Sequence, residues 1–189
     1  MRYLPISKIP LVEEDGATGE VAETYDKIRS FMGIPSVGPG YMALANSPAA
    51  LSIVAGLFQS FMQQTVLPPP LLYMVHYTIS TANKCLCCST GFKDACRSVG
   101  VDEEMLEALV NNLDSVAPKR TQEIIRFAVK CALEPLTLTE ADYDRLRDQG
   151  VSEQELVEII FWAGYARFND TLADASKLDV PEQQQIIEE

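Results

Sequence analysis

The stretch LLYMVHYTISTANKCLCCSTGFKDACRSVG, residues 71–100, predicts two consecutive helices that meet at a cluster of three cysteines. Three prolines at positions 68–70 precede it and favour a helix start, because proline suits the first helical turn. Asn83 and Lys84 stand directly before the cluster, where they can end the first helix. Gly100 ends the second helix, since glycine is common just beyond a helix C-terminus. The pattern therefore puts the cysteines near a helix N-terminus.

The chain before this stretch is also predicted to be helical. Apolar residues recur at helical spacing between positions 21 and 32, and Gly33 ends that helix. PSVGPG, residues 35–40, is predicted to be a loop. Ser47 followed by Pro48 predicts an N-cap and the first position of a further helix, whose apolar face continues toward the prolines.

The second half of the chain contains two copies of one sequence motif, GVDEEMLEAL from residue 100 and GVSEQELVEII from residue 150. Each copy has a glycine, a valine, a capping residue (Asp102 or Ser152) and an amphipathic helix, which gives a helix–Gly–helix repeat. Ser152 with Glu155 matches a capping box, and Thr139 with Asp142 matches a weaker acidic version of it. TQEIIRFAVKCAL, residues 121–133, predicts one more helix between the two copies.

The last predicted helix runs from Ser152 to about Lys177 and is apolar nearly all round in LVEIIFWAGYARF. A helix of this kind is either buried or at a subunit interface. The sequence has no alternating strand pattern longer than a few residues, so the predicted fold class is all-α. We expect a single domain over residues 1–189, with an extended lead-in at 1–16 and a polar tail at 180–189.

Composition excludes several classes of function. The chain has 189 residues and 47% hydrophobic content, enough for a sizeable core, and its net charge of −12 argues against nucleic acid or an anionic membrane as a partner. No apolar run approaches the roughly 18 to 20 residues of a membrane span, and the first residues do not look like a secretory signal. We therefore expect a cytoplasmic protein. In a reducing cytosol, clustered cysteines indicate redox or metal chemistry more often than structural disulfides.

Helix geometry restricts how the cysteines can pair. Cys85 and Cys88 are three apart and share one helix face, whereas Cys87 points to another. Cys96 lies two turns beyond Cys88, roughly 12 Å along the axis, which is too far for a bond within one helix. Cys85 and Cys88 are therefore the predicted dithiol, and their place at a helix N-terminus predicts a lowered thiol pKa. Cys96 and Cys131 are predicted to be core residues.

The run LPPPLLYMVHYTISTANKCLCCSTGFKDACRSVGVDEEMLEAL resembles the alkyl hydroperoxidase D-like, carboxymuconolactone decarboxylase-type family, in particular its peroxidase-related branch. ETYDKIRSFMGIP, ANSPAALSIVAGLF, LTEADYDRLRDQGVSEQELVEII and FNDTLADA look like the same branch, so the resemblance covers about residues 12–179. It implies an all-helical, AhpD-like homo-oligomer whose C-x-x-C reduces peroxides and is recharged by a dithiol donor. It also implies that Cys88 attacks the peroxide and that Cys85 resolves the sulfenic acid as a disulfide.

The sequence departs from the family pattern at three places. Tyr73 stands where the family has a glutamate, Phe92 where it has a histidine, and Cys87 where it often has histidine or tyrosine. The usual proton relay is therefore missing, and such help is typically worth about 10²–10⁴ in rate. His76, the only histidine, is the candidate substitute, with Tyr73 as an accessory hydroxyl; the alternative interpretation of both, favoured from the residues, is packing between helices. Cys87 is either a second resolving thiol or a small buried residue.

Two alternatives to a thiol-dependent oxidoreductase stay open from the residues alone. A metal-binding or redox-sensing module could use Cys85, Cys87, Cys88 and His76, and a degenerate helical oligomer could have lost the chemistry. Decarboxylation of a lactone acid is disfavoured because the dithiol would have no part in it. No cofactor or metal is expected, and the aromatic residues of the last helix are interpreted as core or interface. Asp170 and Asp174 are interpreted as a solvated i,i+4 pair or the lining of an oligomer cleft.

Overall fold

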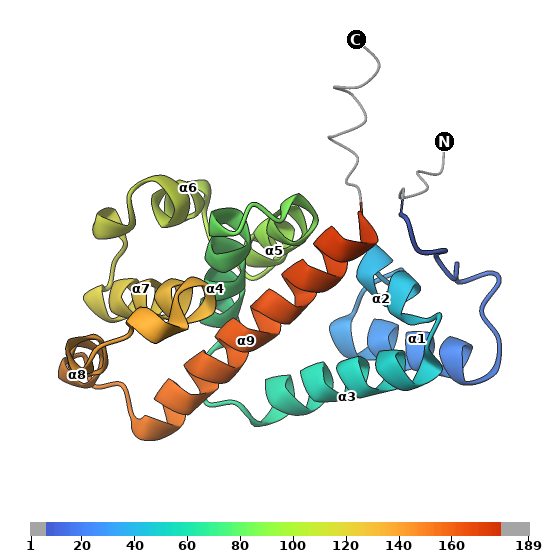
Figure 1. The fold of residues 1–189 in the computed structure, drawn as a ribbon, viewed down its shortest axis with the longest axis horizontal. Helices are drawn as coiled ribbons and strands as arrows, with labels where there is room; N and C mark the ends of the chain where they lie inside the picture. Colours follow the sequence, from blue (N-terminus) through green and yellow to red (C-terminus); the bar gives the residue numbers. More distant parts are fainter. Residues whose placement is uncertain (1–6, 179–189) are drawn as a thin grey trace, which may run out of the picture. The chain divides into compact units, whose positions relative to one another are not determined.

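The structure, a computed structural model, describes residues 7–178, and all the regular secondary structure there is helical (Figure 1). The all-α prediction is confirmed for this part of the chain. The described residues form two compact units, one from residues 7–65 with 172–178 and the other from Val66–Thr171. The expectation of one domain stays a prediction, and the predicted tail at 180–189 lies outside the described residues. None of the helices between residues 7 and 178 has the length and apolar content that a bilayer-spanning segment needs.

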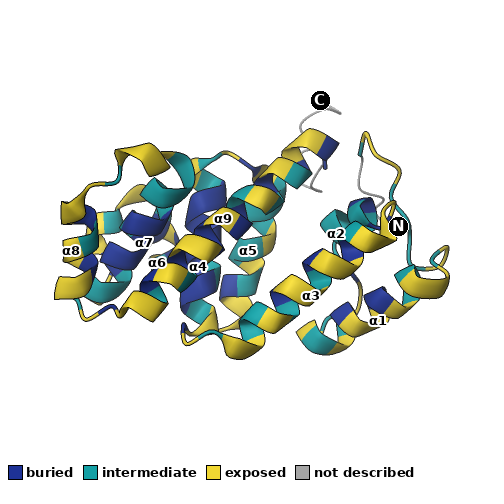
Figure 2. Ribbon diagram, turned by 60° about the horizontal axis from the view of Figure 1, so that its bottom comes forward, coloured by how far each residue is buried: buried dark blue, intermediate teal, exposed yellow. Residues whose placement is uncertain are grey.

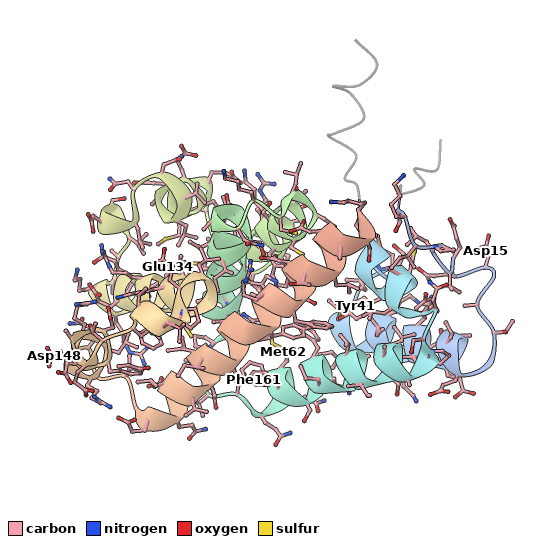
Figure 3. The ribbon with its side chains drawn as sticks, viewed as in Figure 1. Asp15, Tyr41, Met62, Glu134, Asp148 and Phe161 are labelled. Carbon is pink, nitrogen blue, oxygen red and sulfur yellow. The ribbon has the colours of Figure 1, made fainter. Side chains whose placement is uncertain are left out.

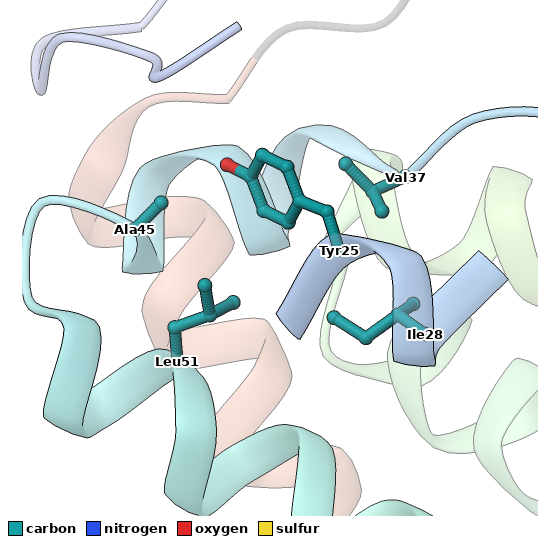
Figure 4. Packing of buried hydrophobic residues seen from close by; sticks show 5 residues of the cluster. All are labelled: Tyr25, Ile28, Val37, Ala45 and Leu51. Carbon is teal, nitrogen blue, oxygen red and sulfur yellow. The ribbon is translucent and has the colours of Figure 1, made fainter. Parts of the chain in front are cut away.

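The first unit is built around a small apolar core. It contains α1 (Gly19–Met32), α2 (Pro39–Leu44) and α3 (Pro48–Gln64), and residues 7–16 precede them without a helix. The Tyr25 hydroxyl donates a hydrogen bond of 2.8 Å to the Val12 carbonyl, so the buried phenol is satisfied by the lead-in. Figure 4 shows the core side chains, which are Tyr25, Ile28, Val37, Ala45 and Leu51.

The helix ends of this unit follow the local rules that the sequence indicated. Gly33 has a φ of 64°, the left-handed conformation that closes α1, and the Ser47 hydroxyl accepts from the Ala50 N–H at 3.3 Å. Helix α2 was not predicted. Pro39, placed in the predicted loop, is the first residue of this helix, because the fixed φ of proline already matches the first helical turn.

Helix α4 is the central element of the second unit. Every residue from Met74 to Ser80 is buried, and α4 packs against α5, α6 and α7; its buried surface is dark blue in Figure 2. The Trp162 indole donates to the Leu72 carbonyl at 2.7 Å, which ties α9 to α4. The helices are α4 (Pro69–Ala82), α5 (Leu86–Ser98), α6 (Glu103–Asn111), α7 (Lys119–Leu133), α8 (Glu140–Asp148) and α9 (Glu153–Ser176), with short 3-10 helices at Leu113–Ser115 and Pro135–Thr137.

The predicted repeat is present at both places. Gly100 and Gly150 have φ values of 86° and 71°, and a capping side chain follows each of them. Asp102 accepts from the Met105 N–H at 2.7 Å, and Ser152 and Glu155 form the reciprocal bonds of a capping box. These glycines are required at the two turns because a side chain would strain a left-handed backbone.

Helices α7 and α8 contact each other, and Glu134 and Asp148, labelled in Figure 3, mark their C-terminal ends. Asp142 is buried between the two helices. Its Oδ2 accepts from Lys130 Nζ at 2.8 Å and from the Thr139 N–H at 2.7 Å. Arg145 pairs with its other oxygen. The predicted Thr139–Asp142 capping box is therefore also an ion-pair site that joins two helices.

Candidate active site

The two helices of the opening stretch join through a sharp turn. Helix α4 ends at Ala82, and Lys84 has a φ of 62°, a left-handed conformation that is uncommon for a residue with a side chain. The Cys85 N–H donates to the Ser80 carbonyl at 2.9 Å, and Cys85 is the N-cap of α5. Asn83 and Lys84 thus separate the helices as predicted, and the cysteines occupy the start of the second helix.

The two cysteines of the C-x-x-C meet a carboxylate from a distant part of the chain. The Cys85 Sγ, the Cys88 Sγ and a carboxylate oxygen of Asp170 all lie within 4.8 Å of one another. Cys85 is fully buried and donates to the Asp170 backbone carbonyl at a sulfur–oxygen distance of 4.0 Å, whereas Cys88 is partly exposed. The predicted dithiol is therefore brought together, with Cys88 partly exposed and Cys85 enclosed.

The Asp170 carboxylate is fixed from the end of α4. Ser80 Oγ donates to Oδ1 at 2.7 Å, and Asn83 Nδ2 donates to Oδ2 at 3.0 Å. Arg167 Nη1 lies 4.0 Å from Oδ2 on the same side of α9. Asp170 has 0% exposure, so these neighbours replace the water that a carboxylate normally binds.

The electrostatics of the dithiol differ from the prediction. The pKa of Cys88 is raised well above its usual range, first by its hydrogen bond with Cys85, then by burial and by negative charge on Cys85, Asp170 and Cys87. The predicted lowering by the helix N-terminus is therefore wrong, because several acidic groups share one desolvated place. Burial also raises the pKa of Asp170, and this effect outweighs the hydrogen bonds from Ser80 and Cys88, which act to lower that pKa.

His76 lies in an aromatic cluster and not in the group that surrounds the dithiol. Its ring stacks on Phe92 with centroids 3.4 Å apart, and Trp162 and Tyr165 contact it edge-on. It is fully buried, and neither ring nitrogen has a hydrogen-bond partner among residues 7–178. Burial lowers the pKa of His76 to about 3, so the near-neutral pKa on which its candidacy as a base rested is not found.

The positions that differ from the family pattern lie together. Tyr73 and Phe92 are in edge-to-face contact at 6.0 Å, so the glutamate and histidine positions are occupied by an aromatic pair. Burial raises the pKa of Tyr73, which makes it a poor proton acceptor at neutral pH. Cys87 is partly buried on α5, and neither it nor His76 belongs to the compact group formed by the described Cys85, Cys88 and Asp170. The candidate metal ligands considered from the sequence are therefore not all brought together in one group among the described residues.

Asp170 is the site residue that the sequence interpretation missed. The structure separates the i,i+4 pair, because Asp170 is buried and Asp174 is exposed. The signal was available in the helical phase of α9. Asp170 lies one turn beyond Ala166 and two beyond Ala163, both fully buried, and so falls on the apolar face of the helix. An acidic residue in such a position requires polar partners, which Ser80 and Asn83 provide.

No protein-family model and no curated protein matches the chain. Several solved structures do match. An uncharacterized peroxidase-related protein from Ralstonia eutropha JMP134, described as an alkylhydroperoxidase AhpD core, superimposes with a TM-score of 0.81 at 18% identity over 96% of this chain and 95% of its own. A second such protein, from Silicibacter sp. TM1040, gives a TM-score of 0.75 at 22% identity over 85% of this chain and 84% of its own.

A third match carries a ligand. The debrominase Bmp8, in a cysteine-to-alanine variant bound to 2,3,4-tribromopyrrole, gives a TM-score of 0.77 at 16% identity over 95% of this chain and 96% of its own. At such identities the likeness concerns the backbone and not the chemistry of the site. The chain therefore has the all-helical fold of the alkylhydroperoxidase AhpD core and of the peroxidase-related proteins that share it.

Proposed function

We propose that the protein is a thiol-dependent oxidoreductase of the alkylhydroperoxidase type, in which Cys88 and Cys85 form the redox couple. The observation that carries the proposal is the convergence of the two sulfurs, with Cys88 the more exposed and Cys85 fully enclosed. An accessible sulfur suits the attacking role, since a peroxide must reach it from solvent. An enclosed neighbour suits the resolving role, because it meets only what forms on the first sulfur.

The proposed reaction oxidises the dithiol by two electrons. The Cys88 sulfur attacks the outer oxygen of the peroxide, the S–O bond forms, the O–O bond breaks, and the alcohol leaves. The Cys85 sulfur then attacks the sulfenic sulfur of Cys88, and the disulfide forms as water leaves. Peroxide and two thiols thus give alcohol, water and one disulfide, and an external dithiol donor reduces the disulfide again. A homo-oligomer in the cytoplasm that uses such a donor is part of the same proposal.

The test is a thiol count with peptide mapping. One equivalent of tert-butyl hydroperoxide should remove two of the five free thiols and link Cys85 to Cys88 in the first bond formed. Cys96 and Cys131 should stay alkylatable once the protein is unfolded. Cys96→Ser, on the same helix but outside the dithiol group, is the matched control and should behave as the parent. Five thiols after treatment would instead support the degenerate oligomer.

The likeness to a debrominase supports a second candidate, reductive removal of bromine from an aromatic ring. The same dithiol would be oxidised, because an organic bromide and two thiols give the hydrogen-substituted ring, bromide, a proton and the disulfide. The two candidates therefore differ in the oxidant and not in the cysteine product. Incubation of the reduced protein with 2,3,4-tribromopyrrole separates them. Bromide release matched to disulfide formation supports debromination, and unchanged thiols leave the peroxide as the oxidant.

A further inference from the structure

We propose that Asp170 is the proton acceptor and donor of the dithiol, in place of the glutamate and histidine that Tyr73 and Phe92 have replaced. The inference rests on the proposed function, since it assigns the proton transfers of that reaction. It concerns a residue 82 positions beyond Cys88 in the sequence, which α9 brings to the start of α5.

The first support is direct contact. The Cys88 Sγ, the Cys85 Sγ and a carboxylate oxygen of Asp170 lie within 4.8 Å of one another, so one group can exchange protons with either sulfur. Ser80 and Asn83 each occupy one lone pair of a different carboxylate oxygen, and each oxygen keeps a second one. The two bonds hold the carboxylate in place without blocking proton transfer to or from it.

The second support is the charge around the carboxylate. Ser80 and the cap residue Asn83 face it from α4, Cys85 and Cys88 from α5, and Arg167 from its own helix. Burial pushes its pKa upward, toward the range in which a carboxylate accepts protons effectively at neutral pH. The guanidinium at 4.0 Å opposes full neutralisation and so favours the ionised form that can act as a base.

The third support is that the other candidates are unsuitable. The His76 nitrogens face an aromatic cluster and the burial-lowered pKa of about 3 makes the imidazole a weak acceptor. The pKa of Tyr73 is raised. Cys88 cannot rely on spontaneous ionisation either, since its own pKa is raised, so the attack needs removal of its proton by a group in contact.

The proton path balances in both steps. The Asp170 carboxylate takes the S–H proton of Cys88 as the sulfur attacks the peroxide, and the resulting carboxylic acid gives it to the departing alkoxide. In the resolving step the carboxylate takes the Cys85 proton and gives it to the departing hydroxide, which leaves as water. Asp170 returns to the carboxylate after each step, so no further acid or base is consumed.

The main variant is Asp170→Asn, with Asp174→Asn, one turn further on and exposed, as the matched control. We expect Asp170→Asn to slow the reaction of Cys88 with tert-butyl hydroperoxide at pH 7 by about 10²–10⁴, and the control to react at the parent rate. The opposite sign is expected from electrostatics alone. Loss of the negative charge lowers the pKa of Cys88, which raises its thiolate fraction and would speed the attack. A variant that is as fast as the parent, or faster, overturns the assignment.

A second variant keeps the proposal testable if Asp170→Asn folds poorly, which circular dichroism would show. Ser80→Ala removes a hydrogen bond that lowers the pKa of Asp170, so the acidic limb of the pH–rate profile should move to higher pH. An unmoved limb contradicts the assignment. Failure of the proposed function is distinguishable, because the parent itself would then form no Cys85–Cys88 disulfide. If only the role of Asp170 is wrong, the parent and both variants form that bond at similar rates.

Discussion

At the scale of single residues, His76 is fully buried, and neither of its ring nitrogens has a hydrogen-bond partner within the described part of the chain, which is rare for a histidine. Its neighbours Phe92, Trp162 and Tyr165 are aromatic rings that pack against it. A buried polar group without a partner costs about 1–3 kcal/mol, so the imidazole is held by ring stacking at the expense of its hydrogen bonds. Ring packing thus accounts for the position of His76. The free-energy cost of burying it grows when the ring must take up a proton.

That cost predicts a pH-dependent stability. Burial holds the pKa of His76 in the folded protein at about 3, against the ordinary histidine value of 6.5, so the unfolded chain binds the proton more readily. The free energy of unfolding therefore falls as the pH drops below 6.5, and His76 accounts for about 2 kcal/mol of this loss by pH 5. We expect the free energy of unfolding of His76→Leu to fall by about 2 kcal/mol less than that of the parent between pH 7 and pH 5, as measured by urea denaturation.

The same variant bears on catalysis. With Asp170 as the base, His76→Leu should react with peroxide within about twofold of the parent at pH 7, because the imidazole is not a member of the group formed by the described Cys85, Cys88 and Asp170. A loss of tenfold or more in a normally folded variant would restore His76 as the base.

The stability prediction has its own contrary outcome. If the free energy of unfolding of His76→Leu and of the parent depended equally on pH, the ring would not be buried in the neutral form.

The residues of the site differ in how far the sequence could predict them. Cys85 and Cys88 were predictable, since spacing three along a helix places two side chains on one face. Asp170 was not placed, because its partners Ser80 and Asn83 are some ninety positions away and only the docking of α9 on α4 joins them. The pKa of Cys88 was missed for the same reason. A local rule for helix N-termini ignores a distant carboxylate.

At the scale of helices, Asp142 makes three stabilising interactions where α7 and α8 meet. It closes the capping box with Thr139, pairs with Lys130 from the neighbouring helix and pairs with Arg145 on its own. These contacts hold the pKa of Asp142 far below its usual range, with the hydrogen bond from Lys130 as the largest cause. The carboxylate therefore stabilises the fold only where it is ionised.

We predict that Asp142→Asn lowers the free energy of unfolding by about 1–3 kcal/mol at pH 7, through a weakened cap and unpaired cations. The deficit should shrink as the pH falls below about 4, because protonation of Asp142 in the unfolded parent removes the same advantage. Chemical denaturation at several pH values measures it. Asp144→Asn, an exposed position on α8, is the control and should cost less than about 0.5 kcal/mol. Equal losses in the two variants would contradict the structural role of Asp142.

Helix ends were predictable to the extent that they depend on adjacent residues. Ser47, Asp102 and Ser152 cap the helices that the sequence indicated, because a cap is a hydrogen bond within four residues. Helix α2 was not predicted because its six residues include a proline and a glycine, two residue types that favour loops. Its Ala43 is buried, so packing within its unit overrides that preference.

At the scale of the whole molecule, the dithiol, Asp170 and the two side chains that hold Asp170, Ser80 and Asn83, all belong to the unit Val66–Thr171. The other unit has its own core, in which Leu51 is fully buried. This division predicts that core damage in the first unit changes stability without changing the chemistry of the site.

We expect Leu51→Ala to lower the free energy of unfolding by about 2–5 kcal/mol, and to leave the peroxide rate of the folded protein within twofold. Urea denaturation and a rate measurement well below the unfolding midpoint give the two values. Leu57→Ala, on the same helix but 36% exposed, is the control and should cost much less. A slower reaction in folded Leu51→Ala would mean that the first unit contributes to catalysis.

The raised pKa of Cys88 has a consequence for how the redox couple responds to pH. The pKa of Cys88 is raised well above its usual range, so this sulfur of the reduced pair carries a proton at neutral pH. Two-electron reduction of the disulfide then takes up at least this proton, and the midpoint potential falls by at least about 30 mV for each unit of pH. A modest rise in pH would thus stabilise the disulfide against a fixed reductant, and acidification would favour the dithiol.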